Sequence, residues 1–220
     1  MNTKCIFYEV CQNKECCSED CLRYAEMHYL LDHSGLPSNL KGKTILSPEQ
    51  LDYDAFCKLA EIKHNILDFV QQGKNLYLYS ENTGNGKSSW LAKLLKSYFN
   101  QVWAGNGFRQ RGYFLHLPTF LIELKENIRT PDDELLSLKD FLKEVDLLCV
   151  DDIAASTLSE YEHNYLLYII DYRLSCGKST LYSSNLNEQN LLLYLGTRLK
   201  SRVFNNSQII HLQGQDRRGL

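Results

Sequence analysis

Short apolar runs alternate along most of the chain with longer segments in which apolar residues recur at helical spacing. The short runs have the length and apolar content of buried strands and lie at 75–79, 113–117, 147–150, 179–183 and 208–212. The longer segments predict helices at 55–72, 87–99, 119–128, 133–143, 159–175 and 191–204. Strands that alternate with helices form a mostly parallel sheet covered on both faces. The pattern therefore predicts an α/β fold.

The first fifty residues follow a different pattern. Residues 22–31 have apolar positions at roughly helical spacing, and a glycine and a proline then end that pattern. Residues 36–50 contain Gly, Pro and Ser without a persistent period, which is typical of a connector. We therefore divide the 220-residue chain into an N-terminal region at 1–35, a linker and a larger domain at 51–220.

The composition is that of an ordinary globular protein. Of the residues, 44% are hydrophobic and 23% are charged, which argues against a disordered or fibrous chain. The N-terminus reaches charged residues within a few positions and no stretch is apolar enough to span a bilayer, so we expect a cytoplasmic protein without membrane contact. The net charge of -3 argues against nonspecific coating of nucleic acid, although a local basic patch could still bind it.

Five of the eight cysteines fall within the first 21 residues. In a chain without an export signal, a metal site explains this cluster better than disulfides do. A tetrahedral zinc site needs four ligands, and Cys17 and Cys21 are one helical turn apart and can face one ion. A region of about 35 residues seldom folds without such a staple. We expect zinc on Cys5, Cys11, Cys17 and Cys21, with an iron–sulfur cluster or unligated thiols as the alternatives.

Residues 81–88 read Glu-Asn-Thr-Gly-Asn-Gly-Lys-Ser, between a predicted strand and a predicted helix. A phosphate-binding loop reads Gly, any four residues, Gly, Lys and Ser or Thr, and only Glu81 departs from this pattern. In such a loop, backbone N–H groups surround the phosphates, the lysine reaches the β- and γ-phosphates, and the serine hydroxyl coordinates Mg²⁺. A simple strand-to-helix turn is the alternative. The predicted nucleotide-binding residues are Asn82, Thr83, Gly84, Asn85, Gly86, Lys87, Ser88 and Ser89.

Polar residues follow two further predicted strands. Asp151 occupies the position of a carboxylate that holds magnesium, and Asp152 that of the group that polarises the attacking water. Many proteins with this motif carry a glutamate at the second place. The side chain of Asp152 is one methylene shorter and would shift the water, so we expect slow hydrolysis. A helix N-cap is the alternative role for Asp152. Asn185 follows the strand at 179–183, where it could sense the γ-phosphate or simply form a turn.

The order of the segments GNGKS, LLCVDDI, SSN and LGTRLKSRVF resembles that of AAA+ helicase loaders of the DnaC and DnaI type, particularly their phage-encoded relatives. The likeness covers about residues 50 to 220 and implies a P-loop NTPase of the AAA+/ASCE class that binds ATP and lacks a C-terminal lid. It also implies that Arg202 acts as an arginine finger on a neighbour's ATP, with Arg198 beside it, and that Arg217 senses nucleotide in its own subunit. A solvated helix face is the alternative for Arg202. The predicted catalytic residues are Lys87, Asp152, Asn185 and Arg202.

The resemblance further implies an ATP-dependent loader that delivers a replicative helicase of the DnaB type to single-stranded DNA and self-associates on the helicase. In such loaders the N-terminal region binds the helicase, a role that falls here to residues 1–35. The DNA contacts would combine basic and aromatic side chains, for which the candidates are Arg109, Arg111, Lys125, Phe108 and Tyr113. Two alternatives stay open: a transposase helper of the IstB type, expected to lack the cysteine-rich start, and an initiator of the DnaA type, expected to carry a duplex-binding helix-turn-helix.

Overall fold

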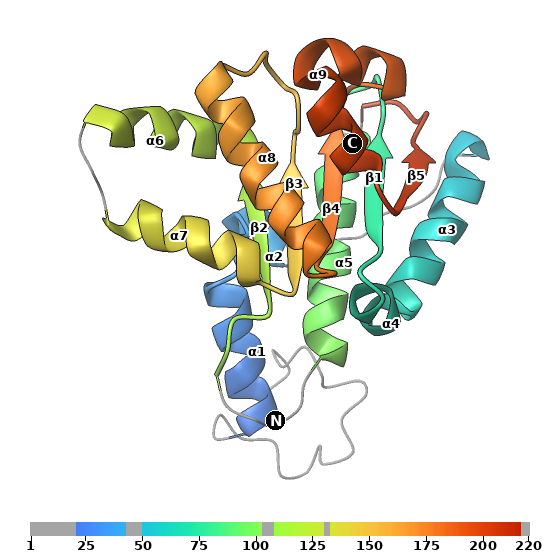
Figure 1. The fold of residues 1–220 in the computed structure, drawn as a ribbon. Helices are drawn as coiled ribbons and strands as arrows, with labels where there is room; N and C mark the ends of the chain where they lie inside the picture. Colours follow the sequence, from blue (N-terminus) through green and yellow to red (C-terminus); the bar gives the residue numbers. More distant parts are fainter. Residues whose placement is uncertain (1–20, 43–49, 103–107, 130–132, 217–220) are drawn as a thin grey trace.

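The computed structural model describes residues 21–42, 50–102, 108–129 and 133–216. Within them, five parallel strands form one sheet in the order β2-β3-β4-β1-β5 (Figure 1). The strands are β1 (Asn75–Tyr79), β2 (Gly112–His116), β3 (Leu147–Asp151), β4 (Ser179–Ser184) and β5 (Ser207–His211). All five predicted strands are confirmed, with bounds that differ by no more than one residue.

Helices connect the strands and flank the sheet. They are α1 (Leu22–Asp32), α2 (Ser38–Lys41), α3 (Tyr53–His64), α4 (Ile66–Gln71), α5 (Lys87–Gln101), α6 (Leu117–Arg129), α7 (Asp133–Glu144), α8 (Glu160–Ser175) and α9 (Glu188–Phe204), with a 3-10 turn η2 at Gln50–Asp52. The single helix predicted at 55–72 is wrong, because the backbone leaves the helical conformation at Asn65 (φ -104°, ψ 27°). The resulting change of direction lets α4 bury Ile66, Phe69 and Val70. The predicted linker contains α2.

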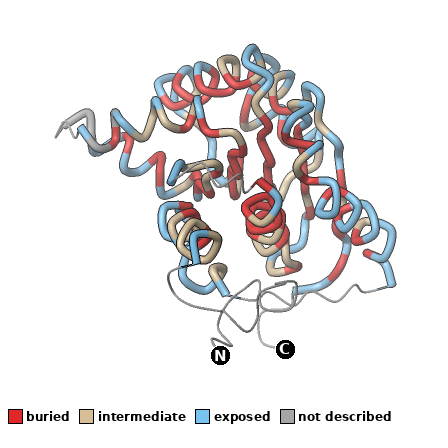
Figure 2. Tube along the Cα trace, turned by 90° about the horizontal axis from the view of Figure 1, so that it is seen from below, coloured by how far each residue is buried: buried red, intermediate tan, exposed pale blue. Residues whose placement is uncertain are grey.

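Alternate residues of β1 to β4 supply two separate hydrophobic clusters, one on each face of the sheet. Leu76 and Leu78 pack with α1 to α5, whereas Tyr77 packs with α6 to α9. Figure 2 shows that buried residues concentrate on the strands and on the inner sides of the helices. The fold is therefore three layers, helices–sheet–helices, as the alternation of strands and helices predicted.

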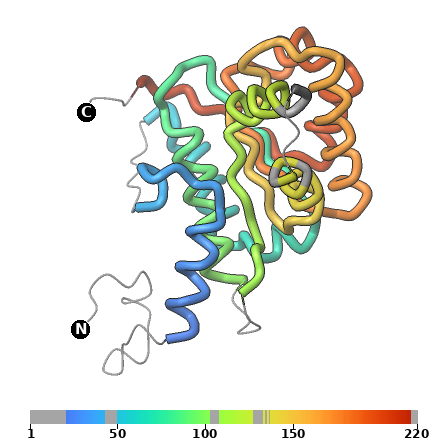
Figure 3. Tube along the Cα trace, turned by 90° about the vertical axis from the view of Figure 1, so that its left-hand side faces the viewer, coloured from blue at the N-terminus to red at the C-terminus, as the bar shows by residue number. Residues whose placement is uncertain are grey.

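The described part of the N-terminal region packs against the larger domain. Met27, Leu30 and Leu36 are buried in the cluster that includes α5, and α1 lies beside α5 (Figure 3). The ammonium group of Lys96 on α5 donates to the carbonyl oxygens of Leu40 (2.8 Å) and Gly42 (2.6 Å). Residues 21–42 thus share one core with the sheet.

A capping box fixes the start of α8. The hydroxyl of Ser159 accepts the N–H of Glu162, whose carboxylate accepts the N–H of Ser159 (2.7 Å). We expect Ser159→Ala to lower the free energy of unfolding by about 1 kcal/mol in urea denaturation. The matched control is Ser175→Ala at the other end of α8, where the hydroxyl donates to the carbonyl of Tyr172 (2.8 Å). Equal losses for the two variants would contradict a capping role.

Candidate nucleotide-binding site

The predicted phosphate loop connects β1 with the start of α5. Gly84 and Gly86 have positive φ angles of 69° and 100°, which glycine adopts without a steric penalty. The helix begins at Lys87, so its unpaired N–H groups and the positive end of its dipole lie at the loop. This local geometry is that of an anion-binding site.

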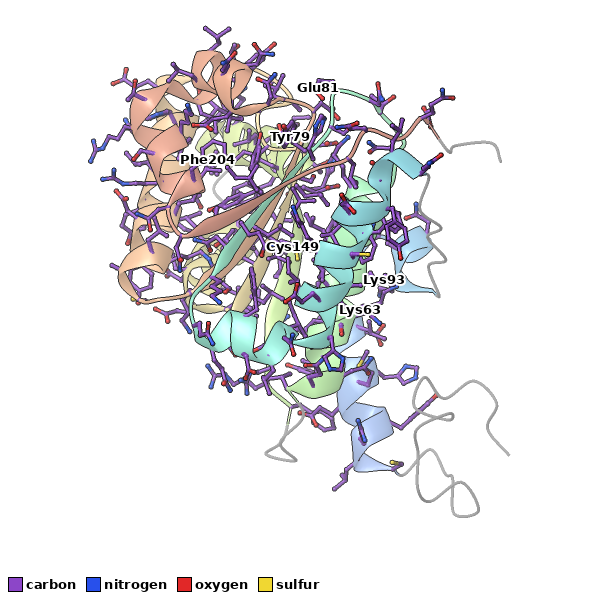
Figure 4. The ribbon with its side chains drawn as sticks, turned by 90° about the vertical axis from the view of Figure 1, so that its right-hand side faces the viewer. Lys63, Tyr79, Glu81, Lys93, Cys149 and Phe204 are labelled. Carbon is purple, nitrogen blue, oxygen red and sulfur yellow. The ribbon has the colours of Figure 1, made fainter. Side chains whose placement is uncertain are left out.

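Glu81, the residue that departs from the loop pattern, makes its side-chain contacts outside the loop. Its carboxylate pairs with the imidazole of His211 on β5 (2.8 Å) and accepts from the Asn187 amide (3.4 Å). Its φ is not positive, so the side chain costs no left-handed backbone strain. Figure 4 shows Glu81 and Tyr79 at the same end of the sheet, and Tyr79 stacks on the His211 ring. The substitution therefore ties the loop to β5.

The Lys87 side chain folds back across the loop and is 6% exposed. Its ammonium group donates to the carbonyl oxygens of Asn82 (2.9 Å) and Ser80 (3.4 Å) and to Oδ1 of Asn85 (3.4 Å). The Asn85 amide also donates to the Ser80 hydroxyl (2.5 Å), which braces the loop. The loop thus holds a buried cation among oxygen acceptors, where a phosphate oxygen would be a stronger partner.

Asp151 ends β3 beside the start of α5 and is 4% exposed. Burial raises the pKa of its carboxyl and the charge of Asp152 adds to the rise, whereas hydrogen bonds from Ser183 and Ser88 oppose it. The Ser183 hydroxyl of β4 donates to Asp151 Oδ1 (2.5 Å). A carboxylate and a hydroxyl together are oxygen ligands of the kind that Mg²⁺ prefers. Asp151 and Ser88 therefore fit a magnesium ion.

Asp152 follows β3 in a left-handed conformation (φ 58°), and its N–H donates to the Ser183 hydroxyl (3.0 Å). The N-cap role for Asp152 is wrong, because the next helix, α8, is capped by Ser159. The imidazole Nε2 of His116, at the end of β2, lies 3.8 Å from Asp152 Oδ2, and its Nδ1 lies 2.8 Å from the Thr119 hydroxyl. Ligand atoms of His116, Asp151 and Asp152 all lie within 4.8 Å of one another.

The sequence analysis missed His116. It lies far from Asp151 in the sequence, and only the register of the parallel pair β2 and β3, which places His116 opposite Asp151, brings them together. The available signal was a polar residue near the end of the strand predicted at 113–117. A histidine here adds a polar contact to the carboxylate proposed to orient water.

Asn185 follows β4, which lies between β1 and β3 in the sheet. The residue is therefore placed between the strand that leads into the phosphate loop and the strand that ends in Asp151. The next helix, α9, is capped by Asn187, whose side chain accepts the N–H of Asn190 (3.0 Å). The position suits contact with a γ-phosphate, and the role of Asn185 stays a prediction.

No protein-family model matches the chain, and no curated protein sequence matches it significantly. Among solved structures, the DnaC helicase loader matches with a TM-score of 0.64 and 21% identity, over 78% of this chain and 95% of that one. DnaI matches with a TM-score of 0.66 and 22% identity, over 81% and 95% of the two chains. The replication initiator DnaA bound to AMPPCP and single-stranded DNA matches with a TM-score of 0.57 and 16% identity, over 86% and 52%.

The chain has the fold of the solved DnaC and DnaI helicase loaders. The resemblance deduced from the motifs is thus confirmed at the level of the fold. In the described part of the chain, no helix has the length and apolar character needed to cross a membrane.

Arg202, predicted to reach a neighbour's ATP, and Arg198 beside it lie on α9 beyond a break at Gly196 (φ 68°, ψ 170°). Arg202 Nε donates to Asp171 Oδ1 on α8 (2.6 Å), and the two side chains are 37% and 38% exposed. Arg198 is exposed. Both guanidinium groups reach the surface, as a contact with a second subunit requires.

Other candidate residues lie outside the described residues. They are Arg217 and the cysteines Cys5, Cys11 and Cys17. Cys21 is described: it is an exposed free thiol at the N-cap position of α1. The zinc site and the nucleotide sensor at Arg217 therefore stay predictions.

Two of the basic residues proposed to contact DNA instead make ion pairs within this fold. Arg111 pairs with Asp146 (2.6 Å), and Lys125 pairs with the nearly buried Glu162 (3.1 Å). Tyr113 packs edge-on against Phe141. Packing and charge pairing within the fold therefore account for Arg111, Lys125 and Tyr113. Arg109 and Phe108 are exposed.

Proposed function

We propose that this protein is an ATP-dependent loader of a replicative helicase. One observation carries the proposal: Ser88, which follows the loop lysine Lys87 at the start of α5, lies beside the buried Asp151, in a fold shared with solved helicase loaders. The loop, the cation and the carboxylate together meet the chemical needs of a magnesium nucleotide.

In the proposed mechanism, the loop residues Asn82 to Ser89 bind the phosphates of ATP, and Lys87 neutralises charge on them. Ser88 and Asp151 would hold Mg²⁺, which would supply further charge neutralisation. Asp152 orients the attacking water and Asn185 contacts the γ-phosphate. The short Asp152 side chain predicts slow hydrolysis, stimulated by assembly or by DNA.

We further propose that ATP controls assembly. Arg202 would reach the nucleotide of a neighbouring subunit. Its guanidinium group would then either leave the ion pair with Asp171 or bind Asp171 and the phosphate together. An arginine finger neutralises charge that grows on the transferred phosphoryl group. Self-association on the helicase follows from such a shared site.

The partners proposed are a helicase of the DnaB type, bound by the N-terminal region, and single-stranded DNA. The solved DnaA that matches this fold was bound to single-stranded DNA and AMPPCP, which supports both ligands for this chain. Zinc on Cys5, Cys11, Cys17 and Cys21 would stabilise the helicase-binding region. The protein would act in the cytoplasm.

Size-exclusion chromatography with light scattering, with the helicase of the host or phage and with or without ATP, tests this function. We expect the intact chain to form a complex, and a variant lacking residues 1–20 not to. This truncation keeps α1, whose Met27 and Leu30 belong to the main core. An intact, folded chain that never joins the helicase would remove the loader assignment.

An initiator of the DnaA type is the second candidate, since domain III of the Thermotoga maritima DnaA matches the fold with a TM-score of 0.60. The chain spans about half the length of the DnaA bound to single-stranded DNA (52%). Specific binding to duplex DNA, without any helicase complex, would favour this candidate over the loader.

A further inference from the structure

Residues 212–216, which follow β5 and which we call the strap, lie against the phosphate loop. Leu212 extends the pairing of β5 with β1, since its N–H donates to the carbonyl of Tyr79 (2.9 Å). The Asn82 amide of the loop donates to the carbonyls of Gln213 and Gly214 (3.1 Å each). Figure 4 shows the chain leaving β5 and running toward the start of α3.

Asp52, just before α3, anchors the strap from its other side. This carboxylate is fully buried (0% exposed) and accepts the N–H groups of Gln213 (2.6 Å) and Gly214 (3.0 Å). Hydrogen bonds from two successive N–H groups to one carboxylate are strong and directional. The course of the strap is therefore fixed up to Gly214, between Asp52 and Asn82.

This course places the carboxylate of Asp216 directly on the phosphate loop. A Cβ added at Gly84 would lie 1.7 Å from Asp216 Oδ1, so the carboxylate packs against the Cα atom of Gly84. The Thr83 hydroxyl also lies 3.4 Å from Asp216 Oδ2, as a donor. A negative group thus occupies space at a loop whose N–H groups and lysine attract anions.

We propose that the strap is autoinhibitory: Asp216 lowers the affinity of the phosphate loop for nucleotides, most strongly for ATP. The inference rests on the proposed nucleotide site. Because like charges repel, a nucleotide that enters the loop must displace the Asp216 carboxylate or bear its repulsion, and the energy grows with the charge of the phosphate chain. Since the same strap is tied to Asp52, its displacement would also disturb the start of α3. ATP binding would thereby be coupled to movement of the strap.

The test compares the intact chain with Asp216→Asn, which removes the charge and keeps the shape. Titration with fluorescent methylanthraniloyl derivatives of ATP and ADP, with Mg²⁺ at low salt, gives the dissociation constants. We expect the variant to bind the ATP derivative about tenfold more tightly, with a smaller gain for ADP and a gain that shrinks at high salt. The matched control is Asp68→Asn, an exposed carboxylate on α4, with no change expected.

Equal affinities for the intact chain and Asp216→Asn would overturn the inference, as would a gain of the same size in Asp68→Asn. Weaker binding by Asp216→Asn would also overturn it, because the carboxylate would then assist the nucleotide. If the intact chain binds nucleotide and only the charge effect is missing, the proposed function stands and this inference falls. If neither the intact chain nor the variant binds nucleotide, both fall.

Discussion

Lys87→Ala is expected to weaken binding of magnesium-ATP by about a hundredfold or more. The ammonium group lies inside the loop, held by the oxygens of Ser80, Asn82 and Asn85, where it would meet the bound phosphates. Each hydrogen bond from a charged group contributes roughly 1.5–3 kcal/mol, and two such bonds to phosphate correspond to about a hundredfold in affinity. Isothermal titration calorimetry measures the loss, and hydrolysis should fall with it.

The matched control for this prediction is Lys93→Ala. Lys93 belongs to the same helix, but its ammonium group lies over the Trp90 ring (5.0 Å to the centroid) rather than in the loop. The control should bind ATP as the intact chain does. A Lys87→Ala variant that is folded and binds ATP normally would contradict the assignment of the phosphate loop.

Arg173→Met is expected to lower the free energy of unfolding by about 3 kcal/mol. Arg173 is fully buried (0% exposed), and its guanidinium group donates to the carbonyls of Leu142 (2.8 Å), Val145 (2.7 Å) and Ser179 (2.5 Å) and to the Thr180 hydroxyl (2.9 Å). It therefore ties α8 to the end of α7 and the start of β4. Methionine fills much of the volume but leaves these acceptors without their donor, and urea denaturation measures the cost.

The control for this substitution is Arg198→Met, which removes an exposed arginine from the neighbouring helix. Its effect should stay within about 0.5 kcal/mol. Burial lowers the pKa of the Arg173 guanidinium to about 10, so the charge itself is costly in the core. If Arg173→Met were as stable as the control, the prediction would be wrong. Removing the buried charge would then have offset the loss of the hydrogen bonds.

The sequence determined the local parts of this protein. The strand at 75–79 and the start of α5 at Lys87 were predictable because apolar runs, helical spacing and glycines are signals carried by neighbouring residues. The phosphate loop was predictable for the same reason, since Gly84 and Gly86 stand where the backbone has positive φ. The capping box that starts α8 is also a local signal, because Ser159 and Glu162 are only three residues apart.

Only the tertiary structure decided which distant residues meet. The register of β2 against β3 places His116 beside Asp151 and Asp152, and the end of β5 brings Asp216 onto the phosphate loop. Burial decided the role of Arg173, because the position of an arginine within a helical segment does not distinguish a solvated side chain from a buried one. Such contacts depend on strand order and on the packing of whole elements, which the local pattern of a sequence does not encode.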